Sequence, residues 1–413
     1  MSFDKYKELK LDFDYDYKGY PIGKILSVDL ASLAFDKNKF SIRVLLNLFL
    51  KRKIKIPESS ELLFSIGDYR RKDYYEILSY IRNSIREKSD LIDLSKNENN
   101  KVVCISINNI FLSFKIISQS SHLQSLCLLD KMTLASKLVY TLNSIDSLEQ
   151  NQTEHRVSRF ISFCSNLNEE AILDFYYQKK GVETLTLQHG LWFIYSSPPI
   201  DAITYENLVA NKLLCWGKYT KDEFLRYGIE SERIIVSGYP KNHKQLVART
   251  IKGRVKILVL LSRAMFDKNN FELLDLLLTC DVEADFFIKI HPSLSFEKYA
   301  RYASLNGFKM AEDQTIPNLL GSNKYDFSVS YNSTAYYDSY INNCVSLRYK
   351  DSNFDNSIDV MDDGFITAED FMSKLENFRI AVSEESFWLG VSKRLNYILG
   401  LGVNDYGDIF TGK

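Results

Sequence analysis

The sequence lacks the features of a membrane-spanning, secreted or nucleic-acid-binding protein. No apolar run approaches the ~20 residues that a membrane-spanning helix needs, and the longest, such as ILVLL at 257–261, suit a buried strand. Basic residues are not in excess, because 52 Lys and Arg stand against 53 Asp and Glu. This balance argues against a nucleic-acid partner. The N-terminal MSFDKYKELK has no apolar signal core, so we expect a cytoplasmic protein.

Several motifs that would reveal a known chemistry are also absent. The six cysteines are widely spaced and include no CxxC pair, which excludes zinc-ribbon and thioredoxin-like sites and fits a reducing compartment. There is no GxxxxGK[ST], GxGxxG, HExxH or GxSxG. A P-loop kinase, a dehydrogenase, a zinc protease and an esterase therefore have no support.

What is present is the composition of a folded protein, with 45% hydrophobic and 25% charged residues over 413 positions. Short apolar segments alternate with amphipathic helical segments, which predicts parallel sheets covered by helices on both faces. The first-half strands are expected at 61–68, 101–107, 159–165, 182–190, 211–217 and 233–240. The second-half strands are expected at 256–263, 284–293, 308–313, 325–334 and 345–349.

A polar, basic segment at 241–256 separates the two sets of strands. We therefore expect an α/β fold of two Rossmann-like, doubly wound domains facing a central cleft. The expected domains are 1–245, 246–384, and a C-terminal segment 385–413 whose helix returns to the first domain. Ligands of such sheets bind outside the carboxyl ends of the strands, so residues at strand ends are the candidates for function.

Two of the five histidines lie at such strand ends. His189 follows the apolar TLTLQ and precedes Gly190, and His291 follows FFIKI and precedes Pro292. Near neutral pH an imidazole accepts a proton from a hydroxyl or donates a hydrogen bond to a phosphate. The alternative for each is an ordinary polar residue that is satisfied within the protein.

Hydroxyl and charged side chains follow two strands of the second half. Ser333 and Thr334 open a helix after YDFSVS, where backbone N–H groups and hydroxyls suit a phosphate. Asp338 lies about one turn further, where it would accept hydrogen bonds from a sugar diol. Ser262 and Arg263 end KILVLLSR and would offer a hydroxyl and a cation. Plain N-capping and ordinary strand ends are the alternatives.

Four segments together resemble a known family. LQHG (187–190), SGYPKN (237–242), KIHP (289–292) and YNSTAYYD (331–338) occur in the order seen in GT-B-fold transferases of bacterial surface-polysaccharide synthesis. The set is similar to that of the CDP-glycerol glycerophosphotransferases, which show HG, GxPRND, HP and SSxxxD. The resemblance covers residues 160–350, and the first 150 residues match no family.

The resemblance implies roles for the matching positions. His189 would act as the base on the acceptor side, beside Gln188 and Gly190. His291 and Pro292 would contact the donor phosphates, Ser333 and Thr334 would hold them, and Asp338 would contact the donor sugar.

The chain also departs from that family. Lys241 stands in place of an Arg and His243 in place of an acidic residue, which favours a sugar-transferring relative over a polyol-phosphate transferase. HP followed by a Ser/Thr pair is also similar to bacterial sialyltransferases and Kdo transferases. Their acidic-acidic-Gly motif occurs here only at 362–364, too late in the chain for its role to be transferred.

The expected function is a glycosyltransferase that moves a sugar from a CMP- or UDP-type donor to a hydroxyl of a surface glycan. Glu169, Glu170 and Asp68 are further candidates for the base, from nearby strand-end loops on the acceptor side, and Asp68 is also a candidate for acceptor binding. Fixed donors would stabilise the departing phosphate, so no metal or other cofactor is expected. The alternatives are a CDP-polyol phosphotransferase, a sugar-nucleotide epimerase, and a non-catalytic glycan-binding partner of another transferase.

The acceptor of such an enzyme is a glycan or a lipid-linked glycan, so we looked for a membrane-facing segment. RVLLNLFLKRKIKIP (43–57) joins an apolar run to four basic residues within five positions. This composition is compatible with anionic headgroups and predicts peripheral contact with the inner membrane face. The alternative is a buried helix that leads into a charged turn.

Overall fold

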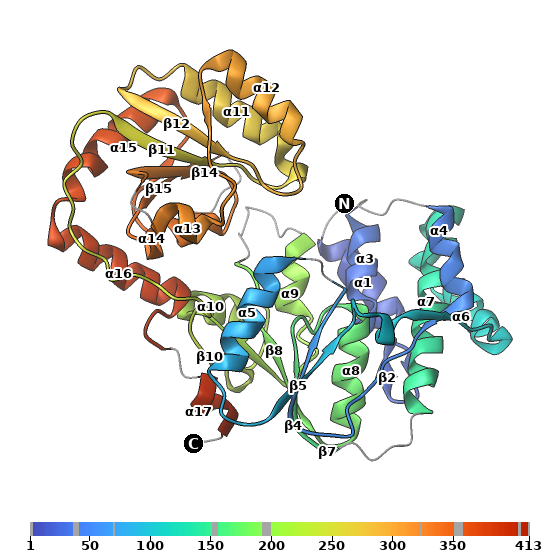
Figure 1. Cartoon of the computed structure of the whole chain (residues 1–413). Coiled ribbons are helices and arrows are strands. Elements are labelled where there is room, and N and C mark those ends of the chain that lie inside the picture. The colour runs from blue at the N-terminus through green and yellow to red at the C-terminus, as the bar shows by residue number, and fades with distance from the viewer. Residues whose placement is uncertain are drawn as a thin grey trace. The chain divides into compact units, whose positions relative to one another are not determined.

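The computed structural model (Figure 1) describes residues 3–35, 41–68, 71–150, 156–191, 200–321, 324–350, 358–403 and 406–411. The chain divides into two compact units. The first extends to Pro240 and includes the C-terminal segment from Val403, and the second comprises Lys241–Gly402. Each unit contains one six-stranded sheet. The predicted α/β fold with two sheet domains is therefore confirmed.

The sheet of the first unit is parallel throughout, in the order β10-β9-β8-β7-β4-β5. Its strands are β4 (Ser59–Ile66), β5 (Ser89–Asp93), β7 (Arg156–Ser162), β8 (Glu183–Leu187), β9 (Lys212–Cys215) and β10 (Ile234–Val236). Side chains alternate along β4, so Leu63 packs in one buried cluster while Leu62 and Phe64 pack in another. Both faces are buried, as expected of a parallel sheet.

Helices supply the other half of each cluster. The Leu63 side is covered by α1 (Phe3–Asp12), α2 (Ile22–Ile25), α3 (Ser27–Ala34), α7 (Leu128–Glu149), α8 (Asn168–Lys179) and α9 (Ile203–Glu206). The opposite side is covered by α5 (Lys72–Asn83) and α17 (Tyr406–Thr411). The short α10 (Lys218–Arg226) packs with β9 and β10.

Two small antiparallel sheets complete the first unit. One pairs β1 (Asp16–Tyr17) with β2 (Tyr20–Pro21), and the other pairs β3 (Leu50–Arg52) with β6 (Lys101–Val103). The second is flanked by α4 (Ile42–Leu45), the 3-10 helix η1 (Leu46–Phe49) and α6 (Ile107–Gln119). Within the described residues, no helix combines the length and the apolar character that crossing a bilayer requires.

The sheet of the second unit is also parallel, in the order β13-β12-β11-β14-β15-β16. Its strands are β11 (Val255–Leu260), β12 (Ala284–Lys289), β13 (Lys309–Met310), β14 (Phe327–Ser330), β15 (Val345–Tyr349) and β16 (Gly364–Phe365). In chain order this is the 3-2-1-4-5-6 arrangement of the Rossmann fold. Its helices are α11 (Asp267–Leu278), α12 (Phe296–Asn306), α13 (Ile316–Gly321), α14 (Ala335–Ile341), α15 (Ala368–Ala381) and α16 (Glu385–Leu399).

The prediction of a strand at 101–107 is wrong in two respects. Only residues 101–103 form a strand, and this strand does not belong to the main sheet. Residues 101–103 pair with β3 outside the main sheet. Ser106 ends the extended stretch, because its hydroxyl accepts the Asn109 backbone N–H (3.3 Å) and caps α6. The edge position next to β4 in the main sheet is filled by β5. Its sequence SDLID has two charged residues and little apolar pattern, so it gives a weak strand signal.

The units also divide at other residues than the sequence suggested. The segment after Pro240 bonds to the second unit, since the Arg249 backbone N–H donates to the Val382 carbonyl (2.8 Å). Helix α16 groups with that unit as well, and the Trp388 indole N–H donates to the same carbonyl (3.0 Å). Only the segment from Val403 belongs to the first unit.

Hydrogen bonds and apolar burial attach α17 to the first unit. The Arg159 guanidinium donates to the Phe410 and Ile409 carbonyls (2.6 and 3.1 Å), and the Tyr406 hydroxyl donates to the Gly238 carbonyl (2.9 Å). Tyr406 and Phe410 are buried among residues of β4 and α5. The C-terminal helix is therefore part of the core of the first unit.

Phe410→Ala should lower the free energy of unfolding of the first unit by about 3–5 kcal/mol, because it removes a buried ring and leaves a cavity. Leu389→Ala is the control, since Leu389 on α16 is 74% exposed, and should cost about 0.5 kcal/mol or less. Urea unfolding of both variants measures the difference. Equal losses would show that α17 is not part of that core.

Candidate functional site

The register of the second sheet aligns two of the predicted site positions, Ser262 and His291, with Asn332, which directly precedes the predicted Ser333. Leu260 of β11 pairs with Lys289 of β12 and with Ser330 of β14. Two residues further along each strand stand Ser262, His291 and Asn332. The point between β11 and β14 is also where the strand order reverses, which is where open parallel sheets bind ligands.

Hydrogen bonds of Ser262 link the strand ends at this edge. Its backbone N–H donates to Asn270 Oδ1 (2.9 Å), and the Asn270 amide donates back to the Ser262 carbonyl (2.9 Å). Its hydroxyl donates to the carbonyls of Tyr331 and Asn332. Because Ser262 is only 1% exposed, its hydroxyl joins the ends of β11 and β14 and is not presented to a donor, contrary to the sequence expectation.

His291 is half-buried and its tautomer is fixed by its own turn. The Ser293 backbone N–H donates to His291 Nδ1 (3.1 Å), so in the neutral ring the proton is carried by Nε2. The Ser293 hydroxyl lies 2.9 Å from the same nitrogen and accepts the Ala264 backbone N–H (3.0 Å). Ser293 thereby links the loop after β12 to the loop after β11.

The residues beside these two loops are open to solvent. Arg263 is exposed, and its guanidinium lies 5.4 Å from the centre of the Phe266 ring, a cation–π arrangement. Pro292 is exposed as well. A guanidinium and an imidazole N–H at one strand edge form an electropositive surface that suits a phosphate.

Ser333 and Thr334 begin α14, as the sequence predicts. The Ser333 hydroxyl accepts the Ala335 backbone N–H (3.3 Å), whereas the Thr334 side chain makes no capping hydrogen bond. Asn332 precedes them with a φ of 37°, in the left-handed region that Asn tolerates better than most residues. This turn directs the chain from β14 into the helix.

Asp338 has a different partner from the one predicted. Its two carboxylate oxygens lie 3.0 and 3.2 Å from Lys241 Nζ, and Asp338 itself is 6% exposed. The carboxylate is thus engaged by a cation of this chain and is barely accessible to a sugar diol. The ion pair joins SGYPKN to YNSTAYYD, two of the segments that carry the family resemblance.

Lys241→Met and Asp338→Asn should each destabilise the second unit by about 1–3 kcal/mol, because each deprives a buried group of this counter-charge. The double variant should lose less than the sum, with a coupling energy above about 0.5 kcal/mol.

Urea unfolding of the two single variants and the double variant measures this coupling. The exposed Lys72–Glu76 pair, with N and O atoms 4.0 Å apart, is the control and should show a coupling of about 0.5 kcal/mol or less. Additive losses at Lys241 and Asp338 would contradict the role of the ion pair.

The first sheet has its own reversal of strand order, between β4 and β7. A cavity of about 220 Å³ lies there within the first unit. It is lined by Ile25, Val28, Asp29, Gly67, Asp68, Leu94, Leu167, Asn168, Glu169 and Glu170. The structure therefore brings together Asp68 and Glu169, both predicted on the acceptor side, at the position where a ligand is expected.

The acidic groups around this cavity differ in environment. The half-buried Glu169 accepts the Tyr140 hydroxyl at Oε1 (2.8 Å), and Asp29 pairs with Lys137. Glu170 is buried, and its Oε1 accepts the Ser65 hydroxyl (2.9 Å) and the Phe163 backbone N–H (2.8 Å). Burial raises the pKa of Glu170 to about 8, so this side chain is a neutral acid at pH 7.

A second buried acid lies one turn further along α8. Burial raises the pKa of Asp174 well above its usual value. Glu170 and Asp174 are both fully buried on α8, and burial disfavours the charged form of each. The other acidic residues that line the cavity are Asp29, Asp68 and Glu169.

His189 lies just after β8, at the same edge of the first sheet. In the register of this sheet Ser65 pairs with Ser162, and Ser162 pairs with Thr186. Asp68 lies three residues after Ser65 and His189 three residues after Thr186, so both follow the same row of paired residues. The half-buried His189 ring packs against Tyr74 and Phe163, with centroids 5.5 and 5.2 Å away. Burial lowers its pKa to about 4, which makes it a neutral but weak proton acceptor. It is not among the residues that line the cavity.

Gln188 and Gly190 flank His189 and are joined by a hydrogen bond. The Gln188 side chain accepts the Trp216 backbone N–H (2.7 Å) and donates to the Gly190 carbonyl (2.9 Å), and Gln188 is buried. It positions the loop and does not face an acceptor, contrary to the sequence expectation. A Cβ added at Gly190 would meet no atom within 4 Å, so no neighbour in the unit requires glycine there.

Sequence reasoning missed three contributors to these sites. Lys241 was noted only as a departure from the family pattern, and Ser293 and Asp29 were not noticed. Ser293 lies two residues after His291 and was detectable as part of the same strand-end turn. The partners of Lys241 and Asp29 are distant in sequence, so no local pattern reveals them. Across the part of the chain that the structure describes, no three His, Cys, Asp or Glu side chains cluster as metal ligands.

Glu170→Gln should change how stability depends on pH. The pKa of Glu170 rises from 4.5 to about 8 on folding, so the folded state holds the extra proton and wild-type stability falls as pH rises through this window. The variant has no such proton and should lose less stability over the same range.

Thermal unfolding at both ends of that window measures the effect. Glu76→Gln, at an exposed position on α5, is the control and should keep the wild-type dependence. If the Glu170→Gln and Glu76→Gln curves run parallel, Glu170 is not a buried neutral acid.

Comparison with known proteins gives no match in sequence and several in structure. No protein-family model matches the chain, and neither does any curated protein sequence. The lipopolysaccharide outer core galactosyltransferase WaaB, in its apo form, aligns with a TM-score of 0.50 and 13% identity over 85% of this chain and 99% of WaaB.

Two further structures align with TM-scores of 0.48. Anabaena Alr3699/HepE in complex with UDP-glucose shares 11% identity over 86% of this chain and 98% of that protein. The Methanocaldococcus jannaschii UDP-GlcNAc 2-epimerase in complex with UDP-GlcNAc and UDP shares 12% identity over 86% and 98%. At such identities a similarity shows the fold alone. Together with the two parallel sheets, the WaaB alignment shows that the chain has the GT-B fold.

Proposed function

We propose that this protein is a glycosyltransferase that moves a sugar from a nucleotide-activated donor to a hydroxyl of a surface glycan. The observation that carries the proposal is that the loops bearing Arg263, His291 and Ser333–Thr334 follow three neighbouring strands at the strand-order reversal of the second sheet. The similarity in fold to a lipopolysaccharide galactosyltransferase agrees with this chemistry.

The second unit would bind the donor through its phosphates. The His291 Nε2–H and the Arg263 guanidinium would donate hydrogen bonds to these phosphates, and the Ser333 and Thr334 hydroxyls follow the end of β14. These groups would stabilise the negative charge that develops on the departing phosphate. The proposed reaction needs no metal or other cofactor, because fixed donors supply this stabilisation.

The first unit would bind the acceptor in the cavity at β4 and β7. About 220 Å³ is below the ~300–1,000 Å³ of pockets for whole drug-sized ligands, so the cavity suits one polar portion of a glycan. Carboxylates such as Asp68 accept hydrogen bonds from sugar hydroxyls. Glu169 is the better candidate for the base, because it lines the cavity whereas the weakly basic His189 does not.

The proposed step is attack by an acceptor hydroxyl on the anomeric carbon of the donor sugar. The bond from that carbon to the acceptor oxygen forms, and the bond to the phosphate oxygen breaks. The hydroxyl proton passes to the Glu169 carboxylate, and the electron pair leaves with the nucleotide phosphate. Asp338 and Ser262 would act as positioning residues, because both are occupied by contacts within the second unit.

Thermal shift tests donor binding with CMP, CDP, UDP, GDP and their sugar conjugates. A ligand at ~100 times its dissociation constant should stabilise the fold by about 2.7 kcal/mol. Arg263→Ala and Thr334→Ala should abolish the shift, and Lys72→Ala at an exposed site of the first unit should not. Cytidine binding would favour sialyl, Kdo or polyol-phosphate transfer, and uridine binding would favour hexose transfer. No shift with any nucleotide would favour the non-catalytic glycan-binding partner.

Turnover with the donor found in this way tests the assignment of the base. Glu169→Gln should lower kcat by about 10²–10⁴-fold, and His291→Ala by about 10²–10³-fold. His122→Asn is the control, because His122 is exposed and pairs with Asp12. If His189→Ala is inactive while Glu169→Gln is not, His189 is the base after all. A product that contains the transferred phosphate would instead show a polyol phosphotransferase.

A further inference from the structure

The segment at the start of the first small sheet exposes an apolar face. Ile42, Leu46 and Phe49 are 78%, 56% and 44% exposed, and no residue of α4 or η1 is buried. Their spacing of four and three residues places them on one side of a helical segment. This result contradicts a buried helix at 43–57 and leaves a surface without an intramolecular partner among the described residues.

Helix α6 also exposes apolar side chains along one face. Ile107, Phe111 and Phe114 recur at spacings of four and three and are between 47% and 71% exposed. The opposite, buried face includes two polar residues, Asn109 and Ser113. The Asn109 amide donates to Asn143 and Asp146 of α7 (both 2.9 Å). Ile116 and Ile117 on this face join the core of the first unit. The helix therefore docks through both polar and apolar contacts and still presents an apolar stripe outward.

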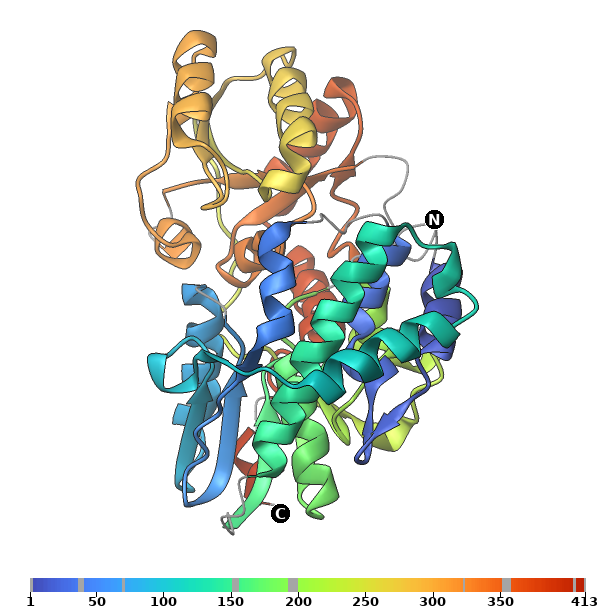
Figure 2. The ribbon, with the colours of Figure 1, turned by 90° about the vertical axis from the view of Figure 1, so that its right-hand side faces the viewer.

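The two segments belong to one continuous structure. Leu50 of β3 pairs with Val103 of β6, and the Cys104 backbone N–H donates to the Phe49 carbonyl (2.9 Å). Phe49 therefore lies beside the end of β6, and α6 begins four residues after that strand. Val103 and Ile105 on this path are also exposed. We call the eight residues the apolar face: Ile42, Leu46, Phe49, Val103, Ile105, Ile107, Phe111 and Phe114. Figure 1 shows α4, α6 and α7 together at one side of the first unit, and Figure 2 turns that side to the viewer.

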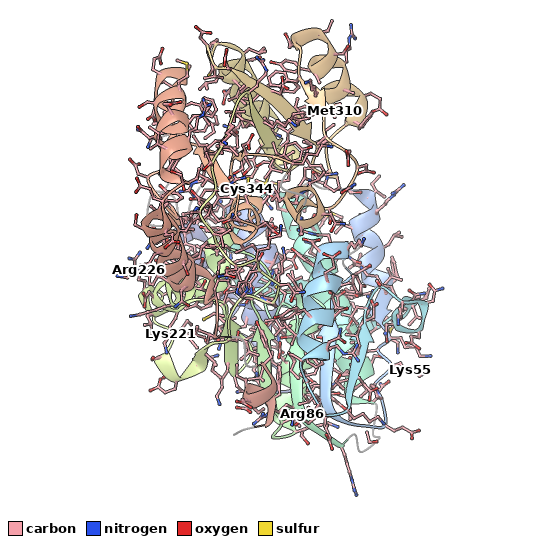
Figure 3. The ribbon with its side chains drawn as sticks, turned by 60° about the vertical axis from the view of Figure 1, so that its left-hand side comes forward. Lys55, Arg86, Lys221, Arg226, Met310 and Cys344 are labelled. Atoms are coloured by element: carbon pink, nitrogen blue, oxygen red, sulfur yellow. The ribbon has the colours of Figure 1, made fainter. Side chains whose placement is uncertain are left out.

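The charged residues of the two segments that carry the apolar face have one sign. Residues 41–57 and 101–118 contain seven Lys and Arg and no Asp or Glu, in a chain whose net charge is -1. The exposed cations are Arg43, Lys53, Lys55, Lys101 and Lys115. Figure 3 labels Lys55 at the outer edge of the first unit, where its nearest anion is Glu98 at 3.6 Å.

We propose that the apolar face is a docking surface for an anionic lipid bilayer. Apolar side chains on short helices, in segments whose own charged residues are all basic, match the boundary between acyl chains and anionic headgroups. Each Lys or Arg near such a surface adds about 1 kcal/mol of attraction. The 13 residues of α6 are too few to span the ~20-residue thickness of a bilayer core, so the helix lies along the interface.

A second copy of this chain is the other occupant to consider. Dimerisation through the apolar face would bring the basic residues of 41–57 and 101–118 in two copies together, which disfavours that arrangement. An anionic bilayer has the complementary charge. The proposal does not rest on the proposed transferase activity, because lipid binding is measured without a donor or an acceptor.

Flotation with vesicles tests the proposal on the full chain. Binding should be strong to vesicles of phosphatidylcholine mixed with phosphatidylglycerol, weak to phosphatidylcholine alone, and reduced by high salt. Phe111→Ser combined with Phe114→Ser should lower binding by about tenfold or more, because two buried rings contribute several kcal/mol. Lys51→Glu combined with Lys53→Glu should lower binding to the anionic vesicles most.

The control is Leu305→Ser combined with Leu389→Ser, since these leucines are each 74% exposed on the second unit. It should bind vesicles as the wild type does, and all variants should keep the wild-type melting temperature. Absence of binding to the anionic vesicles would overturn the proposal, as would an equal loss in the control. A dimer that the Phe111→Ser/Phe114→Ser variant dissociates, without lipid binding by the wild type, would show that the face joins two copies.

Discussion

The parallel hydrogen-bond ladder that joins β11 to β12 on one side and to β14 on the other determines the proposed donor site. Because Leu260 pairs with both Lys289 and Ser330, three separate strand-end loops leave the sheet in one row. A shift of one residue in either pairing would turn the alternating side chains of that strand to the other face. The placement of the loops that carry Arg263, His291 and Thr334 at one edge therefore depends on the register of the sheet.

Around this edge the polar residues divide into those that join parts of the structure and those that solvent reaches. Ser262, Ser293 and Asp338 make contacts that join strand ends, loops or motifs. His291 is half-buried and Arg263 is exposed, and both carry hydrogen-bond donors in the proposed site. The first sheet shows a similar division, in which Gln188 and the neutral Glu170 support the edge while Glu169 and Asp68 face the cavity.

The sequence was sufficient for the strands and helices that have strong apolar periodicity. The strand at 345–349 and the helices beginning at 168 and 385 appear where they were expected. It failed where the periodicity is weak or the packing is tertiary, as for the edge strand β5 and for 101–107, whose apolar residues face outward next to α6. The strand-end positions of His291 and Ser333 were predictable for the same reason as their strands. The Lys241–Asp338 ion pair was not, because its partners are 97 residues apart and meet only after the sheet has formed.

The most direct test of this account is hydrogen–deuterium exchange of the full chain with and without the nucleotide that stabilises it. If the donor binds at the strand-order reversal of the second sheet, exchange should slow in the peptides that contain 262–264, 291–293 and 332–335, because their backbone amides border the phosphates. The peptides of β13 and α12 in the same unit should be unaffected. Protection confined to the first unit, or spread evenly over the chain, would contradict the central claim that these three loops form the donor site.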